Sequence, residues 1–135
     1  RLNCGRLWFD MAKKRAQPEH DEQVRLFNWA RDNEEEYPEL RNMFAIPNGG
    51  ARHLFVAKKL KAEGVKAGVL DIFLATPRDQ GMEKYNGLFI ELKYGNNKPS
   101  KYQKEWITRL TRAGYQCEVC YGFEEARSVI LEYLL

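Results

Sequence analysis

The first half of the chain combines two helical stretches with one short apolar run. Apolar side chains recur at helical spacing over residues 19–32, which predicts a helix that ends in the acidic run following it. Residues 43–46 are predicted to form a short strand, because the Pro-Asn-Gly-Gly sequence directly after them is a strong turn signal. A second helix is expected from Leu54 up to Gly64, a residue that suits the position just past a helix end.

The second half predicts two strands, a helix, a third strand and a terminal helix, over residues 69–75, 87–93, 100–114, 115–121 and 123–135. The first two strands are expected to form a hairpin across a loop that contains Pro77 and Gly81. Ser100 is well placed to cap the helix, and Gly114 to end it. This order of elements predicts a mixed α/β fold, with a small central sheet flanked by helices.

The composition is that of a folded protein of modest size. The chain has 135 residues, of which 44% are hydrophobic and 30% charged, and one domain of that length buries roughly 65–70% of its unfolded surface. We expect an N-terminal extension over residues 1–16, in which Met11 resembles a natural start, and a single domain over residues 17–135. No apolar run approaches the roughly 20 residues of a membrane span, so no membrane partner is expected. The three cysteines, an odd number, argue for a reducing compartment.

Basic residues are concentrated in two segments, although the net charge is only +3. One segment covers residues 52–66 and the other residues 93–112, whereas acidic residues outnumber basic ones over residues 18–41. The two basic segments could neutralise nucleic-acid phosphates. The alternative is that they are solvated helix faces, and charge alone does not separate the two interpretations.

The residues with the clearest chemistry are Asp71 and the sequence Glu91-Leu92-Lys93. Residues i and i+2 of a strand share a face, so Glu91 and Lys93 project together while Leu92 points into the opposite core. Pairing of the two predicted strands would bring Asp71 to the same face. Two neighbouring carboxylates repel unless a cation lies between them, and hard oxygen ligands suit Mg²⁺ or Mn²⁺. The lysine ammonium could orient or help deprotonate a water, which predicts a site for attack on a phosphodiester.

A glutamate and a lysine two residues apart on a strand are, by themselves, an ordinary exposed ion pair. Asp71 favours the metal interpretation, because it interrupts an apolar run. An unpaired carboxylate buried in such a run would cost several kcal/mol, so it needs a ligand or a partner.

Six sequence segments together resemble the VRR-NUC (virus-type replication-repair nuclease) branch of the PD-(D/E)xK phosphodiesterases. They are residues 19–23, 46–50, 64–71, 89–93, 100–106 and 114–121. One departure is Leu70, where the family usually has a proline that shapes the backbone without binding metal. The resemblance implies a restriction-endonuclease-like fold and Mg²⁺ or Mn²⁺ as cofactor, with no organic cofactor. It also implies a cytoplasmic enzyme of a bacterium or of a phage-infected cell.

The resemblance further implies roles within the site. It implies that Asp71 and Glu91 bind the metal ion and that the backbone carbonyl of Leu92 adds a ligand. Lys93 would be the catalytic lysine. Gln103 matches the family's glutamine, which orients the lysine or a phosphate, and the alternative is an exposed helical glutamine.

The family's first-helix glutamate has two candidates in this chain. Glu19 and Gln23 are four residues apart, so they share one face of the helix, and apolar residues follow them on that face. Glu19 can therefore lie where the helix meets the sheet. Glu22 lies on a neighbouring stripe. We favour Glu19 as the catalytic residue. The alternative is that both acids are solvated and stabilised by the helix dipole.

The residues predicted to contact DNA are Asn48, Gly49, Arg52, Lys66, Lys98 and Lys101. The first two belong to a turn whose backbone N–H groups could hold a phosphate at a helix start, and an ordinary turn is the alternative. The other four lie in the basic segments. Trp106 is expected in the core and not as a base-stacking platform. Cys117 and Cys120 are expected as buried small residues on opposite faces of a strand.

Taken together, these expectations predict that the protein is a divalent-metal-dependent DNA endonuclease that cuts four-way (Holliday) junctions. The alternatives are a flap or general duplex nuclease of the same fold, a non-catalytic DNA-binding module, and an adaptor whose basic segments are merely solvated. The resemblance and the symmetric incision of two strands imply a homodimer. The apolar side chains of residues 123–135 could supply part of its interface, or else close the core of a single chain.

Overall fold

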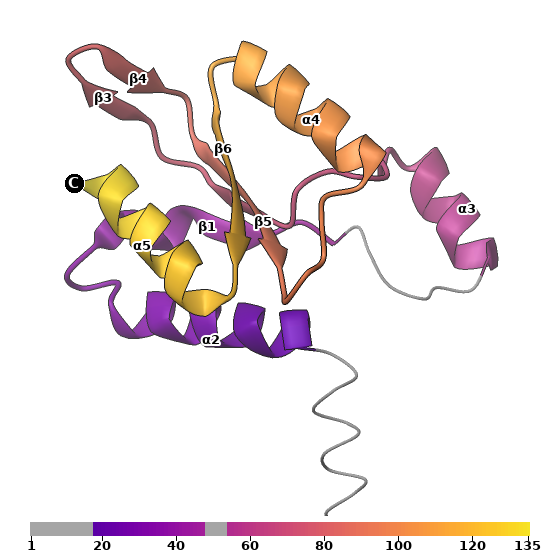
Figure 1. Ribbon diagram of the computed structural model, residues 1–135, viewed down its shortest axis with the longest axis horizontal. Coiled ribbons are helices and arrows are strands. Elements are labelled where there is room, and N and C mark those ends of the chain that lie inside the picture. The colour runs from indigo at the N-terminus through magenta and orange to yellow at the C-terminus, as the bar shows by residue number, and fades with distance from the viewer. Residues whose placement is uncertain (1–17, 48–53) are drawn as a thin grey trace, which may run out of the picture.

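The computed structural model describes residues 18–47 and 54–135 (Figure 1). The helices are α2 (Pro18–Asp32), the short 3-10 helix η1 (Pro38–Asn42), α3 (Leu54–Ala62), α4 (Lys101–Arg112) and α5 (Phe123–Leu134). The strands are β1 (Met43–Ala45), β2 (Ile72–Leu74), β3 (Arg78–Gln80), β4 (Glu83–Tyr85), β5 (Leu88–Lys93) and β6 (Gln116–Tyr121). The predictions for residues 1–16 and for Asn48, Gly49 and Arg52 lie outside the described residues. No helix in the described part of the chain is long and apolar enough to cross a membrane.

The central sheet has four strands in the order β1-β2-β5-β6. Strand β2 is antiparallel to both of its neighbours, and β6 pairs in parallel with β5 after the chain crosses over through α4. Strands β2 and β5 pair so that Ile72 lies opposite Ile90. The expected mixed α/β fold, a small mixed sheet flanked by helices, is confirmed.

Helices α2 and α5 pack on each other and on one face of the sheet (Figure 1). The core on this side contains Leu26 of α2, Ile130 of α5, and Leu88, Ile90 and Leu92 of β5, each at most 1% exposed. These strand residues are the even-numbered ones, so the alternation of the strand turns the odd-numbered side chains to the other face.

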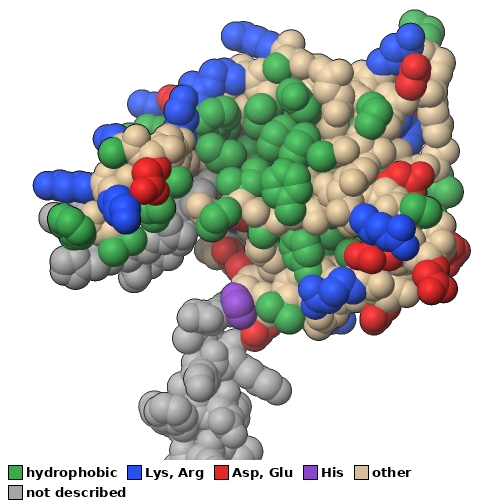
Figure 2. Space-filling view, turned by 180° about the vertical axis from the view of Figure 1, so that it is seen from behind, with side chains coloured by type: hydrophobic (Ala, Val, Ile, Leu, Met, Phe, Trp, Pro, Cys, Tyr) green, Lys and Arg blue, Asp and Glu red, His purple; other side chains and the backbone are tan. Residues whose placement is uncertain are grey.

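That other face carries aromatic rings that α4 covers only in part. The rings of Phe73 and Phe89 stack with centroids 4.3 Å apart, and Phe44 meets Phe73 edge to face. No residue of α4 is buried, and Phe44 is 49% exposed. Figure 2 shows hydrophobic side chains gathered on the back of the molecule, with Lys and Arg side chains along one edge of the group. Trp106 of α4 is therefore not a core residue, contrary to the prediction, because its helix lies at the margin of the sheet.

The structure differs from the sequence prediction in three places. The loop expected between β2 and β5 contains a hairpin of β3 and β4, and η1 follows α2. The strand predicted over residues 69–75 is shorter, because the chain bends at Asp71 just before β2. A long-range contact holds the hairpin: Arg78 donates hydrogen bonds of 2.5 and 2.6 Å to the carbonyl oxygens of Glu132 and Tyr133 near the end of α5.

The predicted helix ends are confirmed. Ser100 forms a capping box with Gln103, in which Ser100 Oγ accepts from the Gln103 backbone N–H and the Gln103 side chain accepts from the Ser100 N–H. Gly64 follows α3 and Gly114 follows α4, and both have the positive φ that suits the residue after a helix.

Helix α5 closes the core of its own chain. Phe123, Ile130 and Tyr133 are buried, and Val129 and Leu134 pack against the same core. Of the two alternatives for this helix, the structure favours core closure, so its apolar side is not free for a partner.

Candidate active site

Asp71 and Glu91 are neighbours across the two central strands. The register that sets Ile72 opposite Ile90 sets Asp71 opposite Glu91 when it is continued by one residue. The backbone N–H of Leu92 donates a hydrogen bond of 2.9 Å to Asp71 Oδ2. The Leu92 side chain is 1% exposed and belongs to the core on the opposite face, as the strand alternation predicts.

Glu91 is buried, and its hydrogen bond from Gln103 and its ion pair with Lys93 both involve the same oxygen, Oε1. The residue is 2% exposed. Lys93 Nζ lies 3.3 Å from Glu91 Oε1, and Gln103 Nε2 donates a hydrogen bond of 2.5 Å to the same oxygen. Within the described part of the chain, the buried Oε2 has no hydrogen-bond partner. An unsatisfied buried carboxylate oxygen is costly, so this atom is suited to a positively charged ligand.

The environment of the pair disfavours two negative charges. Burial, followed by the negative charge of Asp71, raises the pKa of Glu91 to about 7, against the opposing effect of Lys93. Burial also raises the pKa of Asp71, although the hydrogen bond from Leu92 and the charge of Lys93 act in the other direction. Raised pKa values of two adjacent carboxyl groups are typical of a functional site.

Glu19 and Glu22 have different partners. Glu19 accepts a hydrogen bond of 2.9 Å from Asn97 Nδ2, and its charge contributes to the raised pKa of Asp71. Glu22 accepts a hydrogen bond of 2.6 Å from the backbone N–H of Phe123, at the start of α5. Of the two acids, Glu19 is therefore the one whose charge reaches Asp71, while Glu22 holds two helices together.

The oxygen ligands of this site fit a hard divalent cation. Asp71 and Glu91 supply carboxylate oxygens, and the unpartnered Glu91 Oε2 is the atom best suited to bind one. Among the residues the structure describes, no group of three or more His, Cys, Asp or Glu side chains is positioned to hold a metal ion. A cation here would therefore need backbone, water or phosphate oxygens in addition. The Leu92 carbonyl remains a predicted ligand.

Three of the predicted DNA contacts can be located. Lys66, Lys98 and Lys101 are all exposed. Lys101 is the first residue of α4 and Lys98 lies in the loop before it, so both are close in sequence to Gln103. Lys66 Nζ lies 6.0 Å from the ring centroid of Trp106. Exposure is compatible with phosphate binding, and the DNA-binding role stays a prediction.

The structure also brings Asn97 and Tyr121 to the site, which the sequence analysis did not single out. Asn97 donates to Glu19, and the Tyr121 hydroxyl donates a hydrogen bond of 2.8 Å to the Asn97 carbonyl oxygen. The only sequence signal was the pair of asparagines in the loop directly after the Glu-x-Lys strand.

The two cysteines of β6 lie on opposite faces, as predicted. Cys120 is buried in the core beside Leu92, whereas Cys117 is half-buried opposite Phe89. Both thiols are free. Their placement offers no paired thiol ligand for a metal ion.

Comparison with known proteins agrees with this geometry. Residues 10–124 match the VRR-NUC domain family. The chain is similar to a solved structure described as a VRR_NUC domain protein, with a TM-score of 0.70 and 32% sequence identity. That similarity covers 85% of this chain and 86% of the other. No curated protein is significantly similar to this chain. The fold is thus similar to the PD-(D/E)xK nuclease fold, as expected from the sequence.

Proposed function

The chain belongs to the VRR-NUC family and is a nuclease domain; from that membership we propose that it hydrolyses DNA phosphodiester bonds with Mg²⁺ or Mn²⁺, as an endonuclease acting on four-way junctions. The observation that carries the proposal is the pair formed by Asp71 and Glu91, in which the buried Glu91 Oε2 has no partner among the described residues. A divalent cation would relieve both the repulsion within the pair and the unsatisfied oxygen.

Asp71 and Glu91 would hold the cation, with the Leu92 carbonyl as a further oxygen ligand. When bound, Mg²⁺ or Mn²⁺ would offset negative charge on the phosphate and favour ionisation of the attacking water. Gln103 fixes Glu91 by donating to Oε1, which leaves Oε2 available for a ligand. The carboxylates and the amide therefore form one positioned unit.

Lys93 would act on the water and on the phosphate. Its side chain is 13% exposed, and its ammonium is held 3.3 Å from Glu91 Oε1. From there it can donate hydrogen bonds to a phosphate oxygen and orient the water that attacks phosphorus in line with the leaving oxygen. Glu19, held by Asn97, would add negative charge near Asp71 and strengthen attraction for the cation.

Cutting a four-way junction requires two incisions related by symmetry, whereas each chain supplies one set of Asp71, Glu91 and Lys93. We therefore include a homodimer in the proposal, since its two-fold axis can match that of the junction. Exposed Lys98 and Lys101, next to the start of α4, would bind phosphates of the branched DNA.

The test is a cleavage panel with a matched pair of lysine variants. A four-way junction, a flap, a linear duplex and a single strand are incubated with the protein in Mg²⁺, Mn²⁺ or EDTA. We expect the junction to be cut fastest, and only with metal. Lys93→Ala is expected to reduce the rate by at least about 100-fold. Lys84→Ala serves as control, because Lys84 lies on β4, is 71% exposed and pairs with exposed Asp79.

Each part of the proposal can fail separately. Wild-type cleavage rates in Lys93→Ala, or cleavage in EDTA, would contradict the mechanism. Faster cutting of flap or duplex would replace the junction preference with one of the alternative nuclease activities. DNA binding with no cleavage of any substrate in either metal would favour the non-catalytic module. Sedimentation of the protein with and without the junction tests the dimer.

A further inference from the structure

A cavity of about 470 Å³ lies between the residues that follow β1, the segment from Glu63 to Val69, and Trp106 of α4. Its apolar lining comes from Ile46, Pro47, Val65, Val69 and Trp106. None of these side chains takes part in the hydrogen bonds and ion pair that hold Glu91. A cavity of this size and lining suits a flat, largely apolar ring system.

Two walls of the cavity are directly connected to the candidate active site. The backbone N–H of Ile46 donates a hydrogen bond of 2.7 Å to the carbonyl oxygen of Asp71. Val69 precedes Asp71 by two residues, which span at most about 7 Å of chain. A nucleotide whose phosphate lies at Asp71 could therefore reach the cavity with its own base or with that of its neighbour.

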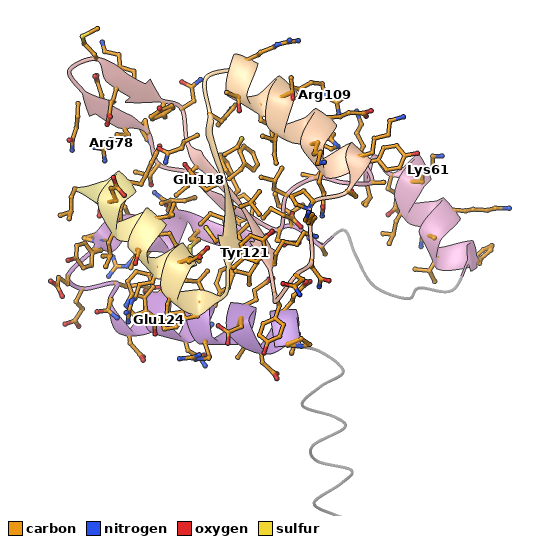
Figure 3. All side chains as sticks on the ribbon, in the orientation of Figure 1. Lys61, Arg78, Arg109, Glu118, Tyr121 and Glu124 are labelled. Atoms are coloured by element: carbon orange, nitrogen blue, oxygen red, sulfur yellow. The ribbon has the colours of Figure 1, made fainter. Side chains whose placement is uncertain are left out.

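Trp106 gives the cavity an aromatic wall, and two cations lie over its ring. Its indole Nε1 donates a hydrogen bond of 3.0 Å to the Ala67 carbonyl oxygen, which fixes the ring. The Arg109 guanidinium carbon lies 4.2 Å from the ring centroid, and Lys66 Nζ lies 6.0 Å from it. Figure 3 shows Arg109 on α4 and Lys61 on the neighbouring α3.

An aromatic ring with basic side chains beside it is the arrangement by which proteins hold single-stranded nucleic acid. The base stacks on the ring while the cations neutralise flanking phosphates. Exposed Lys66 lines the cavity and exposed Arg109 lies over its Trp106 wall, so positive charge borders the cavity, and Glu63 of the described lining only partly offsets it. A phosphate would be poorly solvated in the apolar interior, so the base is the part of a nucleotide that fits there.

We propose that this cavity binds a nucleobase unstacked from the DNA next to the phosphate that is cut. The inference rests on the proposed nuclease function and narrows its substrate class. DNA with unpaired or displaced bases, such as a junction centre, a flap or a single strand, can supply the base freely. An intact duplex must first unstack and unpair it.

The test measures DNA affinity, so it is independent of cleavage. The full chain in EDTA is titrated with fluorescent single strands that are intact or carry one abasic site, moved along the strand. Stacking by the Trp106 ring predicts that Trp106→Leu weakens binding of the intact strand by about 5- to 100-fold. Trp106→Phe keeps an aromatic ring and is expected to stay within about threefold of wild type. Phe44→Leu is the control, because Phe44 is an exposed ring outside the lining of the cavity.

The decisive comparison is between the variant and the abasic strand. At one position along the strand, the abasic site is expected to weaken binding by the wild type as much as Trp106→Leu weakens binding of the intact strand. In the Trp106→Leu variant, the same abasic site is expected to cause no further loss of affinity. Equal effects of Trp106→Leu and Phe44→Leu would overturn the inference. So would a loss in Trp106→Leu that is the same for every abasic strand, or a change in oligomeric state with no change in DNA affinity. If the wild type cuts DNA and Trp106→Leu binds the intact strand as tightly as the wild type, the proposed nuclease function is retained and the proposed base-binding site is rejected. If the wild type neither binds nor cuts DNA, both the nuclease function and the base-binding site are rejected.

Discussion

Gln103 and Glu91 are joined by a hydrogen bond of 2.5 Å from Nε2 to Oε1, while the carbonyl end of the same Gln103 amide accepts from the backbone of Ser100. One side chain thus completes the cap of α4 with its acceptor and holds the buried carboxylate of β5 with its donor. The way α4 begins therefore determines where Glu91 is held.

Replacing Gln103 separates capping from positioning when it is compared with Ser100. Gln103→Ala removes both hydrogen bonds and is expected to lower stability by about 1–3 kcal/mol and to slow cleavage by about 10- to 100-fold. Ser100→Ala removes the hydroxyl cap, which is worth about 1 kcal/mol, and leaves the Gln103 amide in place. Thermal melting and initial cleavage rates measure the two effects. Equal slowing in both variants would mean that Gln103 acts only through helix stability.

Without metal, stability is expected to fall as the pH rises through the range where Glu91 ionises. The pKa of Glu91 is raised from 4.5 to about 7, so the folded chain keeps this proton at pH values where the unfolded chain has lost it. The folded state then binds more protons, and stability declines from about pH 4.5 to about pH 7, by an amount of order 3 kcal/mol. Urea unfolding in EDTA, across this range, measures the decline. The slope should be much smaller in Glu91→Gln, and an unchanged slope in that variant would assign the effect to another group.

A divalent cation is expected to stabilise the fold through the same two carboxylates. Binding to the native state at 100 times the dissociation constant adds about 2.7 kcal/mol, so Mg²⁺ or Mn²⁺ should raise the melting temperature of the wild type. Asp71→Asn and Glu91→Gln should lose this increase together with cleavage. The control is Asp79→Asn on the β3–β4 hairpin, where the carboxylate is 73% exposed. A full metal-induced increase in Glu91→Gln would contradict the assigned ligands.

Replacement of Glu19 and replacement of Glu22 are expected to have opposite effects on cleavage rate and on stability. Glu22→Gln weakens the hydrogen bond to the Phe123 N–H and the ion pair with Arg25, so it should lower stability by about 1 kcal/mol with little change in cleavage rate. Glu19→Gln keeps an acceptor for Asn97 but removes the charge near Asp71, so it should slow cleavage with little change in melting temperature. The reverse pattern would make Glu22 the first-helix acid of the site.

The strands and helices that carry the site could be predicted because their signals are local. Ser100 and Gly114 mark the ends of α4 by their side-chain and backbone preferences. The alternation of β5 turns Glu91 and Leu92 to opposite faces. Asp71 stood out because it follows apolar residues directly.

The remaining features depend on contacts between distant parts of the chain. The three-residue strands β3 and β4 are mostly polar and show no alternation, and Arg78 holds them to α5 carbonyls that lie 54 and 55 residues further on. Asn97 reaches Glu19 across 78 residues. Trp106 lies on an amphipathic stripe that predicts burial, but its helix packs at the margin of the sheet and leaves the ring beside a cavity. None of these contacts leaves a periodic pattern in the sequence.

The amide proton of Leu92 points at Asp71 Oδ2, a side-chain atom of the residue just before the first paired residue of β2. Its chemical shift and its exchange with solvent deuterium therefore depend on how that carboxylate is protonated or coordinated. Leu92 is next to both Glu91 and Lys93 in the sequence, so its backbone amide resonance can report whether a metal ion is bound at the site. The nucleic acid needs no label for this measurement. The sheet thus contains its own spectroscopic probe of occupancy, which remains readable in variants that no longer cut DNA.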